Sequence, residues 1–419
     1  MNTVTRRSLL KAGACALASQ SCPLQMSGVP AAAAAAAEPA VTSFRYHAPQ
    51  SALDDLRLRL RRTRLPDRQT CNDWSQGIPL AQLQALLDYW QNVYDWRRCE
   101  ARLNAFPQYR TQIDGLGIHF LHVRSPHPQA LPLLITHGWP GSVIEFLQLI
   151  RLLTNPTAHG GRAEDAFHVV APSLPGFAFS DKPTERGWNV DRIAAAWAAL
   201  MQRLGYSRYV AQGGDWGAWV TTRLAQQRAP GLLGIHLNMP LVFPSATPAN
   251  PTPAERRALA RMAHFQREEF GFFQVQQTQP QMIGYALADS PSGQLAWIIQ
   301  ILYEFTDNGG DLESALPRDE ILDNVTLYWL TDTAASSARI YLEDAHLVGG
   351  NARVIDLPVG YSVFPRELYR APRAWARACY PQLIYWHELD RGGHFAAWEQ
   401  PELFAQELRA CFGLLRAAA

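Results

Sequence analysis

Residues 209–227, YVAQGGDWGAWVTTRLAQQ, change from an extended run to a helical pattern around one acidic residue. The run Tyr209 to Gln212 predicts a strand, and Ala218 to Gln227 predicts a helix. Small residues flank Asp215, as a nucleophile elbow requires, because a sharp strand-to-helix turn leaves little room for neighbouring side chains. An Asp after glycines is also a common helix N-cap, so this turn alone leaves both interpretations open.

Extended runs alternate with helical spacing on both sides of this turn. The runs before it are 118–123, 131–136 and 168–171, and those after it are 355–363 and 383–389. Such alternation predicts an α/β fold with a mainly parallel sheet, formed by residues 111–240 and 351–416. Residues 241–350 interrupt the alternation with helical, aromatic-rich sequence, which predicts a helical cap inserted into the core.

Two segments precede the core. Residues 42–110 show amphipathic helical periodicity, which predicts an N-terminal helical region that packs on the rest. Residues 1–37 contain the twin-arginine pattern Thr5-Arg6-Arg7-Ser8-Leu9-Leu10-Lys11, a short apolar stretch and an alanine run, typical of a bacterial export signal. We therefore expect a periplasmic or secreted protein, cleaved near Ala37. No later stretch has the length and apolar character of a stable membrane span.

Composition favours a compact protein that acts on a small molecule. The 419 residues are 47% hydrophobic and 18% charged, which excludes a disordered chain. The net charge is +1 and no basic stretch interleaves with aromatic residues, so we expect no nucleic acid partner. No metal-ligand cluster or phosphate-binding glycine loop is visible, so we expect no metal and no cofactor. The sequence leaves open a homo-oligomer and any pairing among Cys71, Cys99, Cys379 and Cys411.

Two more turns follow predicted strands at the edge of the sheet where Asp215 lies. His137-Gly138-Trp139-Pro140-Gly141 comes after 131–136, and a turn-rich loop spans 172–183. Single turns of this kind are common, but three at the C-terminal ends of strands favour a site at that edge. There the backbone N–H groups of Trp139 and Trp216 would form an oxyanion hole.

A histidine and an acid follow Asp215 in the chain order of a hydrolase triad. His394, in the loop after the last predicted strand, is the expected base. Glu367 follows the strand 355–363 and is the preferred acid from its position in the chain. Asp390 is the alternative acid, and Glu367 could instead be a surface ion-pair partner.

The assembled motifs resemble those of the microsomal-type epoxide hydrolases, a branch of the α/β-hydrolase superfamily with an extra N-terminal helical region. The resemblance runs from about Phe44 to Phe412. It rests on RLRRTRLPD (59–67), Tyr94-Asp95-Trp96, HGWPG (137–141), GGDWG (213–217), Asp289-Ser290-Pro291 and DRGGHFAAWEQPEL (390–403). It implies Asp215 as nucleophile, His394 as base, Glu367 as its acid partner, and hydrolysis of apolar epoxides to vicinal diols without a cofactor.

An Asp nucleophile suits an epoxide chemically. Serine would form an ether that water and a histidine cannot cleave, whereas a carboxylate forms an ester that they can. The family generally uses two cap tyrosines as acids for ring opening. Tyr341 matches one of them by its surrounding residues, but Phe272 stands where the other is expected. Tyr285 and Tyr303 are the alternative donors.

Aromatic residues of the predicted cap indicate an apolar pocket wall, although they could equally form the core of the cap. They are Phe265, Phe270, Phe273, Trp297, Phe305, Tyr328 and Trp329. Two other functions are compatible with the sequence. A haloalkane or haloacid dehalogenase shares the Asp nucleophile but needs halide-binding groups. A catalytically silent ligand-binding protein would keep the fold without turnover.

Overall fold

The computed structural model describes residues 40–239, 241–244, 248–347 and 354–416. The predicted export signal, residues 1–37, lies outside the described residues, as do a few positions of the predicted cap. The described strands are β1 (Thr42–Phe44), β2 (Gln108–Ile113), β3 (Leu116–Val123), β4 (Leu131–Thr136), β5 (Phe167–Pro172), β6 (Tyr209–Gly213), β7 (Leu232–Leu237), β8 (Val359–Val363) and β9 (Leu383–Glu388).

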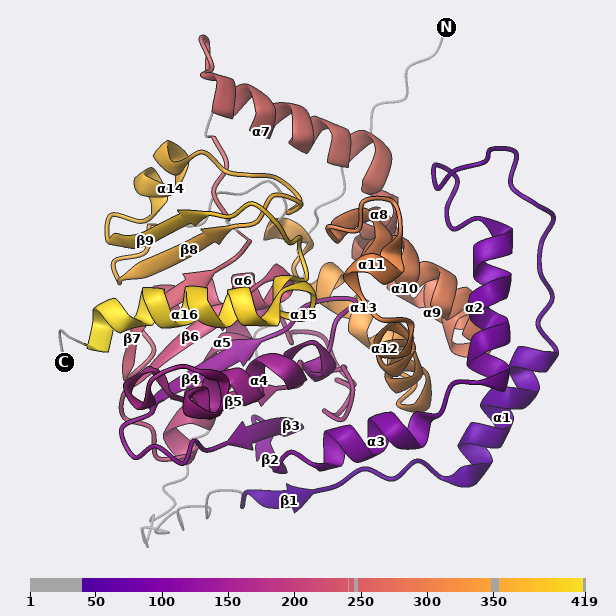
Figure 1. Cartoon of the computed structure of the whole chain (residues 1–419), viewed down its shortest axis with the longest axis horizontal. Coiled ribbons are helices and arrows are strands. Elements are labelled where there is room, and N and C mark those ends of the chain that lie inside the picture. The colour runs from indigo at the N-terminus through magenta and orange to yellow at the C-terminus, as the bar shows by residue number, and fades with distance from the viewer. Residues whose placement is uncertain (1–39, 240, 245–247, 348–353, 417–419) are drawn as a thin grey trace, which may run out of the picture. The chain divides into compact units, whose positions relative to one another are not determined.

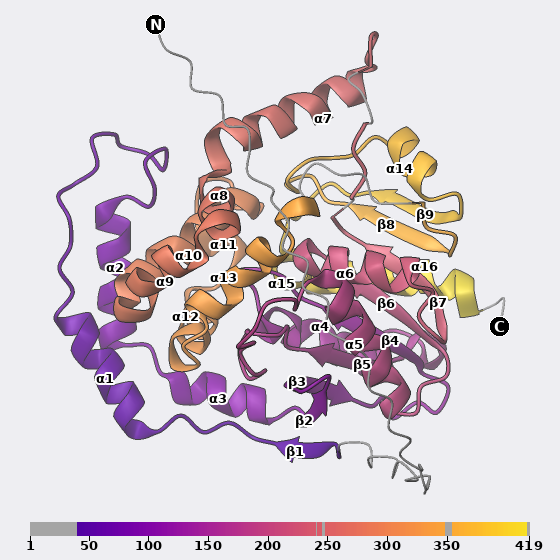
Figure 2. The same ribbon diagram turned by 180° about the vertical axis from the view of Figure 1, so that it is seen from behind.

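These strands form one sheet in the order β1-β2-β3-β5-β4-β6-β7-β8-β9 (Figure 1). Pairing is antiparallel from β1 to β5 and parallel from β5 to β9. The α-helices of the core are α4 (Leu147–Thr154), α5 (Val190–Arg203), α6 (Asp215–Gln226), α14 (Arg373–Cys379), α15 (Ala396–Glu399) and α16 (Pro401–Arg416). Helices α4 and α16 cover one face of the sheet (Figure 1), and α5 and α6 cover the other (Figure 2). This arrangement is the α/β-hydrolase fold.

The central strands are buried on both faces, which explains their continuous apolar sequences. Leu133, Leu134 and Ile135 of β4 are fully buried, as are Val169 and Val170 of β5. Parallel strands covered by helices on both sides bury successive side chains regardless of the face to which they point. The carboxyl ends of β4, β6 and β8 therefore lie next to one another on a rigid support.

Three strands were not predicted, and two are shorter than predicted: β8, and β9 by its last residue. β1 has three residues and β2 reads QYRTQI, so neither carries an apolar run. Gly234 and His236 interrupt the apolar pattern of β7. β8 begins at Val359 rather than at residue 355, because Pro358 directly before it has no N–H to donate to a neighbouring strand.

Seven α-helices lie between β7 and β8 among the described residues, and we call them the cap helices. They are α7 (Pro253–His264), α8 (Gly271–Thr278), α9 (Pro280–Asp289), α10 (Pro291–Phe305), α11 (Leu312–Ala315), α12 (Arg318–Leu330) and α13 (Ala334–Glu343). The N-terminal segment supplies α1 (Gln50–Arg61), α2 (Leu80–Asn92) and α3 (Trp96–Asn104). The described residues between β7 and β8 form no strand, so the cap helices all lie between two strands that are neighbours in the sheet.

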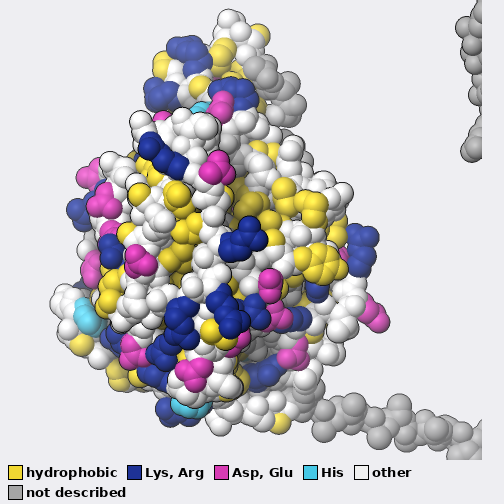
Figure 3. Space-filling view, turned by 90° about the vertical axis from the view of Figure 1, so that its right-hand side faces the viewer, with side chains coloured by type: hydrophobic (Ala, Val, Ile, Leu, Met, Phe, Trp, Pro, Cys, Tyr) yellow, Lys and Arg dark blue, Asp and Glu magenta, His cyan; other side chains and the backbone are white. Residues whose placement is uncertain are grey.

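Side chains of the N-terminal segment bind the cap helices. The Tyr94 hydroxyl and the Arg98 guanidinium donate to the buried Asp323 carboxylate on α12 at 2.8 and 2.7 Å. Arg59 donates to Asp289 at 2.9 Å, which joins α1 to the end of α9. On the face where α1, α2 and α9 lie, basic and acidic side chains are mixed (Figure 3). Three of the sequence motifs, which contain Arg59, Tyr94 and Asp289, therefore hold the cap helices in place.

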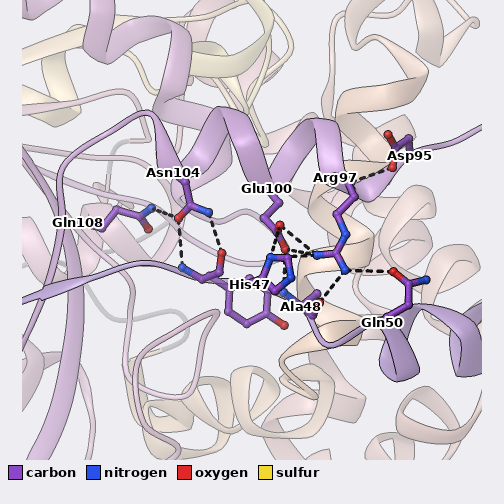
Figure 4. A network of polar contacts seen from close by, with 9 residues as sticks. His47, Ala48, Gln50, Asp95, Arg97, Glu100, Asn104 and Gln108 are labelled. Atoms are coloured by element: carbon purple, nitrogen blue, oxygen red, sulfur yellow. Dashed lines mark hydrogen bonds and ion pairs between the residues drawn. The ribbon is translucent and has the colours of Figure 1, made fainter.

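A polar network attaches the segment between β1 and α1 to α3 (Figure 4). The buried Glu100 carboxylate accepts from the Ala48 backbone N–H at 2.7 Å and from Arg97 at 2.7 Å. Asn104 bonds both the N–H and the carbonyl of Tyr46, at 3.1 and 2.7 Å. Burial opposes ionisation of Glu100, but its hydrogen bonds outweigh burial and lower its pKa. The charged form of Glu100 is therefore stabilised by folding.

Replacing Glu100 with glutamine is expected to lower the free energy of unfolding by about 1–3 kcal/mol at pH 7, because an amide nitrogen then faces donors. A lowered pKa gives stability that is present above the unfolded pKa and lost as the pH falls through the folded one. The difference between the parent and Glu100→Gln should therefore shrink below about pH 4. Urea unfolding at pH 7 and pH 3 measures it, and an equal difference at both values would contradict this role.

Candidate active site

Asp215 lies at the sharp turn between β6 and α6. Its φ is +50°, in the left-handed region that a non-glycine residue seldom adopts. A Cβ atom at Gly217 would lie 1.9 Å from the carbonyl oxygen of Thr136, so only glycine lets α6 approach β4 this closely. The N-cap of α6 is Gly214, and no side chain caps the helix, so the N-cap interpretation of Asp215 is wrong.

Two other chain segments bring a histidine and a glutamate to Asp215. His394 Nε2 lies 3.2 Å from Asp215 Oδ2, and His394 Nδ1 lies 2.6 Å from Glu367 Oε1. Glu367 is 2% exposed and follows β8, whereas the alternative acid Asp390 is exposed to solvent. The structure thus places Glu367, and not Asp390, against the histidine.

The two carboxylates control the charge of His394. Burial alone would favour the neutral imidazole, but Glu367 and Asp215 on its two sides raise the pKa of His394 well above its ordinary value. The charged imidazolium of His394 is therefore favoured in the free enzyme. Removing the negative charge of Asp215 would take away part of this effect and lower the pKa of His394.

The HGWPG loop reaches over the nucleophile from the end of β4. The Trp139 backbone N–H donates to Asp215 Oδ1 at 2.8 Å, and the Trp139–Pro140 peptide bond is cis. Trp216 is the second residue of α6, and its backbone N–H has no acceptor among the described residues. The N–H of Trp139 therefore already contacts the Asp215 carboxylate, whereas the N–H of Trp216, the next residue after Asp215, has no partner within the described ranges.

Polar contacts from distant segments fix this loop. Asn324 Nδ2 donates to the Pro140 carbonyl at 2.8 Å, and the Tyr328 hydroxyl donates to the Gly141 carbonyl at 2.8 Å. The buried His137 accepts from the Leu174 N–H through Nε2 at 3.2 Å, and burial lowers the pKa of His137 to about 4. Asn324 and the role of Tyr328 were missed, because α12 lies almost two hundred residues further along the chain.

An apolar cavity of about 210 Å³ adjoins Asp215. It is lined almost entirely by hydrophobic side chains, which is usual for sites that bind small apolar molecules. Its wall includes four of the predicted aromatic residues: Phe265, Phe270, Phe273 and Phe305. The other three do not line the cavity: Tyr328 belongs to the buried hydrophobic core, and Trp297 and Trp329 pack against that core.

Tyr341, on α13, lies in the wall of this cavity. Its ring centroid is 4.8 Å from that of Trp216, and the side chain is buried. Burial, together with the nearby Asp215 charge, raises the pKa of Tyr341 well above its ordinary value. The phenol therefore keeps its proton and can donate it.

Phe272 occupies the cavity wall beside Tyr341. Its ring centroid lies 6.1 Å from that of Tyr341, and its ring stacks on Trp139 with the two centroids 5.4 Å apart. The alternative donors do not reach the cavity: Tyr285 is 71% exposed, and Tyr303 stacks on Trp74 at 3.8 Å. Two described tyrosines line the cavity, Tyr341 and Tyr369, and the Tyr369 hydroxyl donates to the Val242 carbonyl at 2.8 Å. Tyr341, whose ring packs against Trp216 beside the nucleophile, is therefore the tyrosine that we expect to act as an acid.

Several other features bear on ligands and environment. Within the described ranges, no group of three or more His, Cys, Asp or Glu side chains is placed to hold a metal ion. None of the helices described is both long and apolar enough to cross a membrane. The four described cysteines, Cys71, Cys99, Cys379 and Cys411, are free thiols.

The chain matches two family models, "Epoxide hydrolase N terminus" over residues 41–146 and "alpha/beta hydrolase fold" over residues 132–282. A Stigmatella aurantiaca protein that carries the provisional name of epoxide hydrolase is 66% identical, covering 90% of this chain and 86% of its own. Epoxide hydrolase 1 of Sus scrofa is 36% identical, covering 91% and 90%.

Solved structures agree with these relatives. The juvenile hormone epoxide hydrolase of the silkworm Bombyx mori superposes with a TM-score of 0.83 at 28% identity, over 91% of this chain and 96% of its own. The epoxide hydrolase of Aspergillus niger superposes with a TM-score of 0.80 at 32% identity, over 90% and 96%. The chain therefore belongs to the microsomal-type epoxide hydrolases, a cofactor-independent enzyme family with this N-terminal region on an α/β-hydrolase core.

Proposed function

We propose that this chain hydrolyses small apolar epoxides to vicinal diols through a covalent ester on Asp215. The observation that carries the proposal is the Asp215 carboxylate, held between His394 Nε2 at 3.2 Å and the Trp139 N–H at 2.8 Å, next to an apolar cavity that contains Tyr341. A nucleophile, an oriented base and an acid thus meet at one end of the cavity.

In the first step, a carboxylate oxygen of Asp215 attacks a ring carbon, and the C–O bond of the epoxide breaks. The developing alkoxide takes the proton of Tyr341, whose buried phenol is protonated at neutral pH. The product is an ester between Asp215 and the hydroxylated substrate. The Tyr341 phenolate regains a proton before the next turnover.

In the second step, His394 acts as the base. Esterification removes the Asp215 charge, so the pKa of His394 falls and the imidazole can release its proton. It then takes a proton from water, which attacks the ester carbonyl, while Glu367 holds the ring. The N–H groups of Trp139 and Trp216 would stabilise the tetrahedral oxyanion. The departing oxygen takes the proton from His394 and the diol is released. The second proton of the water then passes from Asp215 to His394, which restores the carboxylate.

The surroundings of Asp215 favour this reaction over the two alternatives. A dehalogenase needs donors for a departing halide, whereas the buried Tyr341 phenol suits an oxygen that must be protonated. A silent binding protein has no need of a histidine held between two carboxylates. Diol formation from styrene oxide and from a long-chain apolar epoxide by the purified chain tests the proposal. Halide release from a bromoalkane, or tight binding without turnover, would contradict it.

We further propose that residues 241–350 act as a cap over the substrate, and that residues 1–37 export the protein to the periplasm or beyond. Aromatic side chains from the cap helices in the cavity wall support the first point. The twin-arginine pattern Thr5 to Lys11 supports the second.

The position of Phe272 beside Tyr341 in the cavity wall leads to a prediction. Phe272→Tyr is expected to speed ester formation by about tenfold, because a second O–H group would share the developing negative charge, whereas Tyr341→Phe should slow it by about a hundredfold. Stopped-flow tryptophan fluorescence with styrene oxide measures this step, since Trp139 and Trp216 lie at the site. A folded Phe272→Tyr variant that forms ester no faster than the parent would contradict this account of Phe272.

A further inference from the structure

A second, smaller cavity adjoins the same catalytic groups. Its volume is about 20 Å³, and its wall includes Asp215 and His394 together with Glu145, Gln212 and Asn238. A polar cavity of more than roughly 10–15 Å³ can hold one water molecule if two to four polar partners face it. This cavity is therefore of the right size and character for a single water beside the nucleophile and the base.

Two buried oxygens in its wall have no protein partner. Glu145 is 8% exposed, and its Oε1 has no hydrogen-bond partner among the described residues. Gln212 Oε1 also has no partner among the described residues, although the amide Nε2 of the same side chain donates to Asn238 Oδ1 at 2.8 Å. A buried oxygen without a partner costs about 1–3 kcal/mol, and a water bound in this cavity would bring the O–H donors that these two residues lack.

The local sequence is arranged to admit this carboxyl group. Glu145 lies in the single turn Val143–Phe146, directly after the HGWPG loop. A Cβ atom at Gly141 would lie 2.3 Å from Glu145 Oε1, so glycine at the end of that loop leaves the room that the carboxyl group needs. An acidic residue within the apolar run Val143 to Leu147 was the available sequence signal, and it was missed.

Glu145 does not compete with His394 for protons. Burial, and to a smaller extent the Asp215 charge, raises the pKa of Glu145 to about 8, although His394 opposes this shift. At neutral pH Glu145 is therefore mainly a carboxylic acid, with one O–H donor and an accepting carbonyl oxygen. Such a group can orient a water molecule and leave its proton for the imidazole.

We propose that this cavity holds the water that hydrolyses the ester, and that Glu145 is a catalytic residue that binds this water and directs its oxygen at Asp215. The proposal rests on the covalent mechanism above. An O–H bond of the water breaks as its oxygen bonds to Asp215 Cγ, and the proton passes to His394 Nε2. The ester C–O bond then breaks and the departing oxygen takes that proton. Asp215 retains the oxygen of the water, and the second proton of the water passes to His394, which restores the carboxylate beside an imidazolium.

The test separates formation of the ester from its hydrolysis. Glu145→Leu removes the proposed hydrogen bonds to the water and keeps a side chain of similar volume. Glu145→Gln keeps a polar group that can bind water. In Glu145→Leu, ester formation should be unchanged and ester hydrolysis about a hundredfold slower, since a misplaced reactant costs about that much. Glu145→Gln should recover most of this loss. Stopped-flow fluorescence follows formation, and mass spectrometry of acid-quenched samples follows the ester on the Asp215 peptide.

Matched variants make each result decisive. Glu407→Gln removes a buried carboxylate of α16 that bonds Ser362 and Tyr385 away from both cavities, so it should leave the ratio of the two rates unchanged. If Glu145→Leu does not fold, Glu145→Ala removes the same carboxyl group without bulk. Equal slowing of both steps, or no slowing of hydrolysis, would overturn the role of Glu145. His394→Gln tests the covalent mechanism itself. If ester accumulates in His394→Gln while Glu145→Leu hydrolyses its ester at the parental rate, only the role of Glu145 is overturned. If His394→Gln forms no ester, both the covalent mechanism and the role of Glu145 are overturned.

Discussion

Replacing Asp215 with asparagine is expected to abolish diol formation, with a loss of about 10⁴-fold or more in kcat. The side chain keeps its shape, but a neutral amide cannot open an epoxide to a hydrolysable ester. Asparagine is the better substitution because Asp215 has a φ of +50°, which asparagine adopts at a lower energetic cost than alanine. Chromatographic assay of the diol from styrene oxide measures the loss.

Asp215→Ala should be equally inactive but less stable, because alanine adopts the left-handed conformation at a cost of about 1–2 kcal/mol. Comparison of the two variants separates lost chemistry from lost folding. A folded Asp215→Asn protein that forms diol at the parental rate would exclude Asp215 as the nucleophile.

The second large effect is expected from His394→Gln, which should form the ester and fail to hydrolyse it. Ring opening needs Asp215 and Tyr341, whereas hydrolysis needs the imidazole as base. Glutamine can still donate a hydrogen bond to Glu367, now 2.6 Å from His394 Nδ1. Intact-protein mass spectrometry after substrate addition should show one covalent adduct per chain, equal in mass to the epoxide, on the peptide that contains Asp215.

A matched control is available on β9. His387 also pairs with a buried carboxylate, Glu407, at 2.8 Å, but it does not line either cavity of the site. His387→Gln should therefore turn over like the parent. An inactive His394→Gln protein with no adduct would show that the histidine acts before or during ring opening, against the mechanism proposed here.

The pH dependence of hydrolysis follows from the same electrostatics. The carboxylates of Glu367 and Asp215 raise the pKa of His394, and esterification neutralises one of them. The base is the neutral imidazole, so the rate of ester hydrolysis falls as the pH drops below the pKa of His394 in the ester. The pKa seen in hydrolysis should therefore be lower than the pKa of His394 in the free enzyme.

Much of the catalytic end of the sheet could be predicted from the sequence because its signals are local. The elbow around Asp215 and the turn at Trp139 follow apolar strands within a few residues. Chain order then favoured Glu367 and His394. The strands β1 and β2 escaped prediction because they are short or polar, and their pairing along the sheet edge is decided by tertiary contacts.

The parts that were missed depend on contacts between distant segments. Asn324 and Tyr328 support the HGWPG loop from α12, and no local pattern links them to it. Glu145 reads as an ordinary residue of an apolar turn until its burial and its unpaired oxygen are seen. Phe272 was found only through the resemblance, and its place beside Tyr341 could not be known without the packing of α8 against α13.

The ester on Asp215 is tested most directly by one turnover in oxygen-18 water with the enzyme in excess over styrene oxide. The diol from this first turnover should contain no oxygen-18, because its new oxygen comes from the Asp215 carboxylate. The peptide that contains Asp215 should instead gain one labelled oxygen. Oxygen-18 in the first diol, with an unlabelled Asp215, would mean that water attacks the epoxide directly and would contradict the covalent mechanism.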